Sequence, residues 1–417
     1  MHIGPFETAA IVVVAAALAA YLNHITLRLP QTIALTLTGA LASAVVLAVD
    51  AVLPGVHLRQ AIVGFMDNID FKTALLNVLL SFLLFAGALQ IDLHHLNRGK
   101  WLIAVLSTVG VVVSTVVVAA GFKLLTGLFG IDAPFIWCLV FGALISPTDP
   151  VAVIALLSKF AAPKLLKTTI AAESLFNDGI GVVVFTILLG AAVDGRMIGV
   201  REGAMLFAHE ALGGVVLGLV LGGVGYWMLR SIEEYATEIL ISIALVMGGY
   251  SLAVPLGVSG PVAMAVAGLI IGNFALSSAM SAHTRDTFER FWELIDHILN
   301  AALFLLIGLQ GLTLLGKPAL LLLAVATIPV VLVARAVSVA PPLFFWRGLL
   351  RFGQAFPLLT WGGLRGGICI AMALALPATP FREAVLAATY AVVMFSVLVQ
   401  GLTIGPLARR TLPPAEA

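Results

Sequence analysis

The sequence predicts an all-α polytopic membrane protein, and its composition and hydropathy pattern carry this prediction. Of the 417 residues, 61% are hydrophobic and only 10% are charged, whereas a soluble domain carries roughly 25% charged residues. The hydrophobic residues form runs of about 20 or more, the length of helix that crosses the hydrocarbon core of a bilayer. A net charge of +1 leaves no basic patch for nucleic acid. Most of the surface is therefore expected to face the lipid bilayer.

Hydrophobic runs of this length divide the chain into thirteen candidate spans. They lie near 6–23, 31–53, 71–91, 101–128, 134–158, 167–192, 202–229, 236–253, 258–276, 291–315, 317–346, 355–376 and 381–409. The first run lacks a basic leader and is interpreted as a span rather than a signal peptide. The longest polar stretch, around Ser281 to His297, is expected to be a loop. Residues 1–417 are thus predicted to form one membrane unit.

Charges in the connecting segments predict the orientation. With an external N-terminus, the cytoplasmic segments carry about twice as many Lys and Arg residues as the external ones, as the positive-inside rule requires. An odd number of spans places the termini on opposite sides. The N-terminus is therefore predicted to be outside and the C-terminus cytoplasmic.

Spans five and twelve are expected to be broken helices. Span five holds Pro147 and Pro150 around Asp149, and span twelve holds four glycines around Arg365. Prolines and glycine runs interrupt helices. Each broken span is the middle one of a triplet, spans 4–6 and 11–13, and the two triplets have opposite directions. This arrangement indicates inverted repeats with two broken, crossing helices and a binding site near the bilayer midplane.

Span six carries the side chains that predict ion binding: Glu173, Ser174, Asn177 and Asp178. Charged groups inside a membrane are costly and usually handle ions or protons. Ser174 lies one helical turn from Asp178, whose carboxylate offers the hard anionic oxygen that a desolvated cation needs. Asn177 adds no second charge. The alternative is a structural polar cluster that holds helices together.

Span five adds two further candidates. Thr148 is able to ligate a cation through its backbone carbonyl or its hydroxyl. Asp149 lies where two half-helices meet, and compensation of their dipoles is favoured over direct ligation.

Two arginines also lie inside spans, and each needs a carboxylate or carbonyl partner. Glu173 is expected to pair with Arg365. Arg335 is expected to neutralise the core or to face the half-helix C-terminal ends of span twelve. Asn300 and Gln310 in span ten are interpreted as polar groups in helix packing.

No enzyme chemistry is predicted. Cys138 and Cys369 lie in apolar runs and are interpreted as buried small hydrophobes. No zinc-protease or nucleophile-elbow motif is present, so neither an enzyme activity nor a cofactor is expected.

Several motifs together resemble those of the bacterial sodium/proton antiporters, of NhaP type, in the monovalent cation:proton antiporter-1 family. They are Thr148-Asp149-Pro150, Glu173-Ser174-Leu175-Phe176-Asn177-Asp178, Val258-Ser259-Gly260-Pro261 leading to Gly268, Ala334-Arg335-Ala336 and Gly362-Gly363-Leu364-Arg365-Gly366. The resemblance implies thirteen helices and a homodimer. It also implies an ion-transporting core (101–192 and 317–409) that moves against a dimerisation or scaffold part (1–91 and 202–315).

The resemblance also implies how the site works. Asp178 would bind the cation or the proton, Ser174 and the Thr148 backbone would assist with the transported Na⁺ or Li⁺, and Glu173 would pair with Arg365. Exchange would be electroneutral, because Asn177 replaces the second aspartate of electrogenic relatives. One departure concerns span three, where some members have a glutamate after Leu-Leu-Phe and this chain has Ala86-Gly87.

The resulting hypothesis is a secondary antiporter that exchanges Na⁺ or Li⁺ for H⁺ by alternating access, with Asp178 shared by both ions. A role in pH homeostasis in a bacterial inner membrane is expected. A K⁺/H⁺ antiporter of the same architecture and a gated cation channel are the alternatives. The broken helices within one protomer favour rocking over a channel filter.

Overall fold

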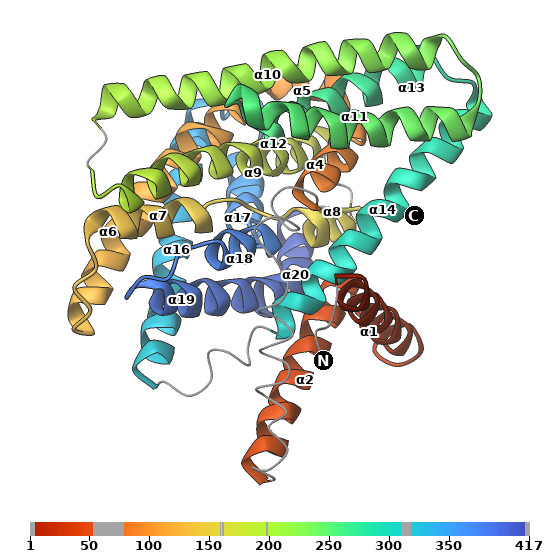
Figure 1. Cartoon of the computed structure of the whole chain (residues 1–417). Helices are drawn as coiled ribbons and strands as arrows, with labels where there is room; N and C mark the ends of the chain where they lie inside the picture. Colours follow the sequence, from red (N-terminus) through yellow and green to blue (C-terminus); the bar gives the residue numbers. More distant parts are fainter. Residues whose placement is uncertain are drawn as a thin grey trace.

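The computed structural model describes residues 5–52, 79–158, 160, 162–196, 199–309 and 318–412. Regular structure in this part of the chain is helical, and its single β-type feature is an isolated bridge between Asp149 and Leu364. Nine of the described helical segments are long and apolar enough to cross a membrane. The all-α membrane fold is therefore confirmed (Figure 1), whereas the count of thirteen spans stays a prediction.

Each predicted span overlaps a helix or a pair of helices. The first nine correspond to α1 (Pro5–Ile25), α2 (Gln31–Val52), α4 (Leu80–Leu89), α5 (Leu93–Ser107) with α6 (Val109–Leu128), α7 (Phe135–Ile145) with α8 (Val151–Leu157), α9 (Lys164–Val193), α10 (Val200–Arg230), α11 (Tyr235–Leu256), and α12 (Gly260–Ile270) with a π-helical segment (Ile271–Ala275) and α13 (Leu276–Ser278). The last four correspond to α14 (Ala282–Leu309), α16 (Pro318–Phe345), α17 (Phe352–Trp361) with α18 (Gly367–Leu374), and α19 (Arg382–Phe395) with a π-helical segment (Ser396–Gln400) and α20 (Gly401–Thr411). Residues 71–78 and 310–315 of the predicted spans, Gln310 included, lie outside the described residues.

The loop expected from Ser281 to His297 is wrong, because α14 begins at Ala282 and continues through this stretch. The stretch is amphipathic: Phe288 and Trp292, one turn apart, are buried in the core. Charges on its other faces pair along the helix, as Arg285 does with Glu289 at 2.9 Å. Its polar residues therefore cover one side of a helix.

The helices pack in two sets that meet at α9. In one set, α2 packs against α14, and α12 packs against α4, α10 and α11. In the other, α6 packs against α7 and α16, α16 against α19, and α9 against α5 and α7. Because α9 also contacts α10 and α12, its polar residues lie close to where the two sets meet. Figure 1 shows α10 and α11 running side by side along one edge of the molecule.

Glycine residues allow some helices to pack very closely. A Cβ atom on Gly39 of α2 would lie 2.6 Å from the carbonyl oxygen of Leu305 in α14, so only glycine fits there. Such contacts are typical of membrane proteins, in which close van der Waals packing holds helices together.

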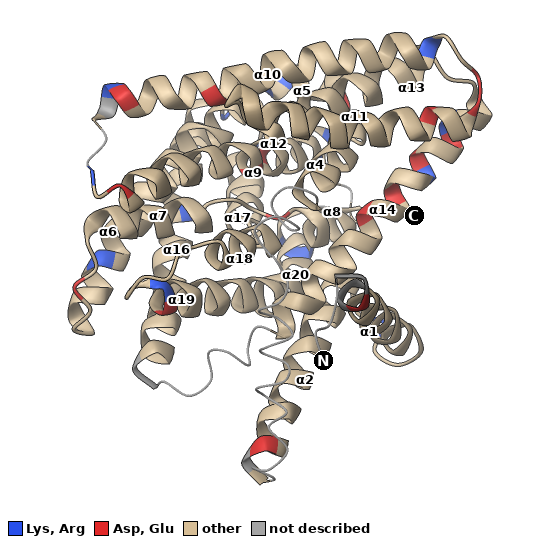
Figure 2. Cartoon of the chain, viewed as in Figure 1, with Lys and Arg blue, Asp and Glu red and all other residues tan. Residues whose placement is uncertain are grey.

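The buried and exposed side chains fit a bilayer environment. Large apolar side chains are exposed along α10, among them Leu212, Val216 and Leu219. Most charged residues lie near helix ends and connections (Figure 2). Cys138 and Cys369 are free and buried, as expected.

Candidate functional site

The site is built around α9, which places four polar side chains in the interior. Glu173, Ser174, Asn177 and Asp178 are 1%, 3%, 1% and 8% exposed. Residues three or four apart on a helix lie on the same side. Ser174, Asn177 and Asp178 therefore lie close together on α9.

Two unwound segments pass beside α9. Helix α7 ends at Ile145 and α8 begins at Val151, while α17 ends at Trp361 and α18 begins at Gly367. The breaks fall at the proline pair and at the glycine run, as predicted.

The two unwound segments contact each other directly. The backbone N–H of Asp149 donates to the carbonyl of Leu364 at 2.7 Å, which forms the antiparallel bridge. Gly366 is needed beside this bridge, because a Cβ atom on it would lie 2.6 Å from Oδ2 of Asp149. The two broken helices are therefore coupled at their centres.

Asn177 fixes the unwound segment of span five to α9. Its Oδ1 accepts a hydrogen bond from the backbone N–H of Thr148 at 3.1 Å, and its Nδ2 donates to the Thr148 hydroxyl at 2.8 Å. The same hydroxyl lies 2.9 Å from the Ser174 hydroxyl. Three expected site residues thus form one buried network, with Asn177 as its anchor.

Asp149 caps the second half-helix of span five. Its Oδ1 accepts a hydrogen bond from the backbone N–H of Val151 at 2.9 Å, at the start of α8. A carboxylate is favourable at a helix N-terminus, where unpaired N–H groups carry a partial positive charge.

Glu173 forms a bidentate ion pair with Arg335 of α16, so the expected partner Arg365 is wrong. Arg335 donates to both carboxylate oxygens, with an Nη2–Oε2 distance of 2.9 Å. It also donates to the carbonyl of Leu359 in α17. The planar guanidinium suits this geometry, because its fork meets both oxygens of a carboxylate.

Arg365 instead binds the carbonyls freed by the break in span five. Its Nη1 donates to Ser146 O and, at 2.9 Å, to Pro147 O. A cation is favourable there because the C-terminal end of a helix such as α7 carries a partial negative charge. Arg365 is only 2% exposed, so these carbonyls replace the carboxylate that it was expected to need.

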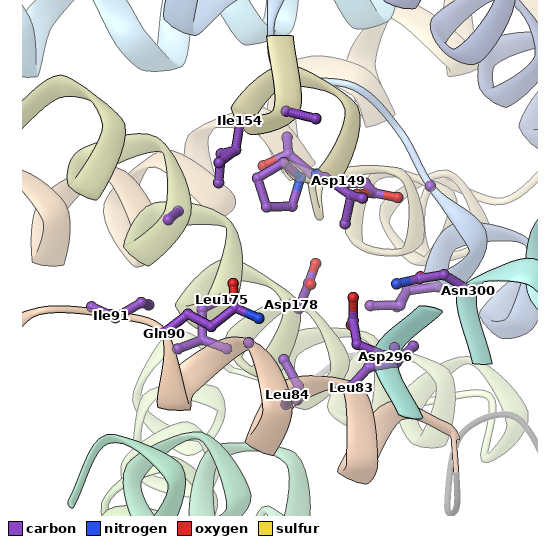
Figure 3. Close-up of a pocket in the computed structure, with 18 of the residues that line it drawn as sticks. Leu83, Leu84, Gln90, Ile91, Asp149, Ile154, Leu175, Asp178, Asp296 and Asn300 are labelled. Atoms are coloured by element: carbon purple, nitrogen blue, oxygen red, sulfur yellow. The ribbon is translucent and has the colours of Figure 1, made fainter. Parts of the chain in front are cut away.

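Asp178 differs from Glu173, Asp149 and Arg365, the charged residues around it that have partners. Within the described residues it has no ion pair and no hydrogen bond. Its carboxylate points into a cavity of about 600 Å³ that Thr148 and Asp149 also line (Figure 3). Exposed residues also line the cavity, among them Gln90 and Ser158 at the C-terminal ends of α4 and α8, and Glu293 in α14.

Among the polar residues that line this cavity and that sequence reasoning missed are Gln90, Asp296 and Asn300 (Figure 3). Asn300 was expected only to pack helices. Asp296 lies in the stretch expected to be a loop, and the spacing of Phe288 and Trp292 was the signal that indicated a helix. No pattern in the sequence marks which face of α4 turns Gln90 to the cavity.

These side chains can bind a desolvated monovalent cation, or a proton, at one carboxylate. Asp178 supplies a charged oxygen, and the Thr148 and Ser174 hydroxyls supply neutral oxygens nearby, the ligand type that hard cations prefer. In the part of the chain that the structure describes, no three His, Cys, Asp or Glu residues form a cluster suited to a resident metal.

Comparisons with known proteins agree with this chemistry. The sequence model of the family described as "Sodium/hydrogen exchanger, transmembrane" matches residues 13–410. The Na⁺/H⁺ antiporter NhaP of Pseudomonas aeruginosa is 46% identical over 395 residues, which cover 94% of this chain and 93% of that protein. The Na⁺/H⁺ antiporter NhaH of Halobacillus dabanensis is 33% identical over 348 residues, 82% of this chain and 83% of that one.

A solved structure has the same fold. The sodium proton antiporter MjNhaP1 from Methanocaldococcus jannaschii superposes with a TM-score of 0.73 over 96% of this chain and 97% of that one, at 21% sequence identity.

Proposed function

Because the chain belongs to the sodium/hydrogen exchanger family, we propose that it is a secondary antiporter that exchanges Na⁺ or Li⁺ for H⁺. Membership of this family makes the chain a transporter rather than an enzyme. The two relatives described above, from Pseudomonas aeruginosa and Halobacillus dabanensis, are named as Na⁺/H⁺ antiporters, which supports Na⁺ as the transported cation.

Asp178 is the proposed shared site for cation and proton. The observation that carries this proposal is that Asp178 faces the cavity with no ion pair or hydrogen bond in the described residues, whereas Glu173 pairs with Arg335. A cation that leaves water needs oxygen ligands, and Asp178, Ser174 and Thr148 offer them. A proton on the same carboxylate removes the charge that holds the cation. Binding of one ion therefore excludes the other, which couples their movements.

The stoichiometry follows from the residues that carry charge near Asp178. Asn177 is neutral and is occupied by Thr148. Asp149 is held as the cap of α8. One carboxylate then carries one monovalent cation in one direction and one proton in the other, so exchange is electroneutral.

Transport proceeds by alternating access in this proposal. The core (101–192 and 317–409) carries the ion by moving against the scaffold (1–91 and 202–315), through which two chains form a homodimer. The cavity is lined by α4 and α14 from the scaffold and by α8, α9 and α18 from the core. With the predicted orientation in a bacterial inner membrane, it opens to the cytoplasm.

The experiment is an exchange assay in proteoliposomes that contain a pH-sensitive dye. Addition of NaCl or LiCl is expected to change the internal pH with the wild type. Asp178→Asn removes the exchangeable charge and is expected to reduce the signal to that of protein-free liposomes. Asp132→Asn is the matched control, because the Asp132 side chain is fully exposed and does not line the cavity. Exchange near the wild-type rate in Asp178→Asn would overturn the proposal.

The same assay tests the cation and the charge balance. Electroneutral exchange predicts an initial rate that does not change when the membrane potential is clamped at different values. A response to KCl as large as that to NaCl would favour the K⁺/H⁺ alternative, and channel-like currents would contradict antiport.

A further inference from the structure

The cavity that leads to Asp178 holds a second carboxylate that forms no ion pair with a Lys or Arg among the described residues. Asp296 of α14 lines it and lies beside Asp178 (Figure 3). The acidic residues that line the cavity are Asp92, Asp149, Asp178, Glu293 and Asp296, and the basic residues are Lys167 and His297. The residues that line the cavity therefore carry more negative than positive charge.

Three of these carboxylates already have partners. Asp92 accepts hydrogen bonds from the His94 backbone and the His95 ring. Asp149 caps α8. Glu293 is 65% exposed and lies 3.9 Å from His297.

Asp178 and Asp296 are the two that remain. Asn300 hydrogen-bonds Asp296 but brings no charge, and neither carboxylate forms an ion pair with a Lys or Arg among the described residues. Asp178 is 8% exposed, without a hydrogen-bond partner in the described chain, and aimed into the space that Asp296 faces. A buried, unpartnered carboxylate of this kind is neutralised by a proton or by a cation.

We infer that Asp296 is a cation-capture residue that binds the entering monovalent cation before it passes to Asp178. This inference rests on the proposed function and adds a residue to it. A cleft lined by one sign of charge raises the local concentration of the opposite ion. Asp296 supplies that charge, and the amides of Asn300 and Gln90 supply neutral oxygens on the same route.

The helix α4, which also lines the cavity, supplies no carboxylate to it. On α4, Ala86 is 1% exposed and brings no charge to the cavity. The neutral Gln90 is the α4-end residue that reaches the cavity. The second carboxylate therefore comes from α14, whereas Asp178 comes from α9.

The test measures the half-saturating Na⁺ concentration and the maximal rate of Na⁺-driven proton flux in proteoliposomes. For Asp296→Asn, the half-saturating concentration is expected to rise by about fivefold or more, about 1 kcal/mol of binding free energy, with the maximal rate within about twofold of wild type. Asp296→Glu restores the charge and is expected to restore the affinity. Asp296→Ser is the second neutral variant should Asp296→Asn not fold.

Glu293→Gln is the matched control. It removes one negative charge one turn away, but at an exposed position beside His297. Its half-saturating concentration is expected to stay within about twofold of wild type. Added choline chloride is expected to reduce the difference in half-saturating Na⁺ concentration between wild type and Asp296→Asn. The reason is that added salt screens the negative charge of Asp296.

An unchanged half-saturating concentration in Asp296→Asn, or one shifted no more than in Glu293→Gln, would overturn capture by Asp296. So would a fall in maximal rate alone that Asp296→Glu does not reverse. These outcomes leave the proposed function intact if the wild type transports and Asp178→Asn does not. A wild type without Na⁺-driven proton flux would overturn both.

Discussion

At the residue scale, the buried charges divide by whether the protein has already neutralised them. Glu173 has Arg335, Arg365 has the carbonyls of Ser146 and Pro147, and Asp149 has the N-terminus of α8. A buried carboxylate without such a partner is costly, so it takes up a proton or binds a cation. On α9, Asp178 is the carboxylate that has no such partner among the described residues. Its lack of a permanent partner is what permits a cation and a proton to alternate on it.

The ion pair between Glu173 and Arg335 is expected to be structural. Arg335→Met leaves the Glu173 carboxylate buried and unpaired, which is expected to destabilise the protein by about 3–5 kcal/mol. In a Glu173→Gln background the same change is expected to cost much less, because no charge remains unpaired. Unfolding in detergent, followed by intrinsic fluorescence, measures this double-mutant cycle.

Arg365→Met provides the control for that cycle. Arg365 binds carbonyls rather than Glu173. The loss of unfolding free energy caused by Arg365→Met is therefore expected to be nearly the same with Glu or with Gln at position 173. A stronger coupling of Glu173 to Arg365 than to Arg335 would contradict the pairing.

Sequence reasoning reached the residues of the site but not all of their partners. Thr148, Ser174 and Asn177 form one network, and each was selected as a polar group inside a span. The pairing of Glu173 was wrong because counting charges requires a cation for it without deciding which one. Both Arg335 and Arg365 lie inside spans, and only the packing of α16 and α17 on the core distinguishes them.

At the element scale, the broken helices were the easiest feature to predict, because proline and glycine act locally. Pro147 and Pro150 lack backbone N–H groups, so the backbone hydrogen bonds of α7 cannot continue through them. The helix at 282–297 was missed for the opposite reason. Its charges were counted as a polar stretch, whereas its fold depends on the spacing of Phe288 and Trp292. The π-helical segments at 271–275 and 396–400 had no signal that sequence analysis used.

Helix α5 begins with a cap that has a testable pH dependence. Asp92 accepts hydrogen bonds from the His95 ring at 2.8 Å and from the His94 backbone N–H at 2.7 Å. The hydrogen bond from His95, followed by that from the His94 backbone, lowers the pKa of Asp92 below its ordinary value. Asp92→Ala is expected to destabilise the protein by about 0.5–2 kcal/mol at neutral pH.

The sign of the pH effect follows from the lowered pKa. The charged cap stabilises the folded state at pH values above the ordinary aspartate pKa, and this stabilisation is lost as the pH falls through the lowered folded value. The difference in melting temperature between wild type and Asp92→Ala is therefore expected to persist into mild acid. Asp92→Asn, which keeps an N-cap acceptor, is expected to lose less. Equal melting temperatures for wild type and Asp92→Ala at neutral pH would contradict the cap.

At the scale of the whole molecule, the cavity was beyond prediction because it is a product of packing. Its walls come from residues as far apart in sequence as Gln90, Asp178 and Asp296. Hydropathy finds the spans that carry them, but the faces of α4 and α14 that meet α9 depend on contacts between all three helices. The one-sided opening of the cavity likewise has no counterpart in the hydropathy pattern.

The opening of the cavity to one side gives a prediction for the orientation of the whole protein. Ala171 of α9 lines the cavity, whereas Asp132, between α6 and α7, is fully exposed and is predicted to lie outside the cell. Each is changed to cysteine in a Cys138→Ala/Cys369→Ala background, so that the native thiols cannot react.

A membrane-impermeant maleimide is then added to vesicles of known sidedness. Ala171→Cys is expected to react in inside-out vesicles and to be protected in right-side-out vesicles, because its route to water is the cavity. Asp132→Cys is expected to show the opposite preference. If the two cysteine variants showed the reverse labelling preferences, the N-terminus would be cytoplasmic and the cavity would open outward. Reaction of Ala171→Cys from both sides would show instead that the protein visits both states of alternating access during the labelling time, so shorter exposures would be needed to resolve the starting orientation.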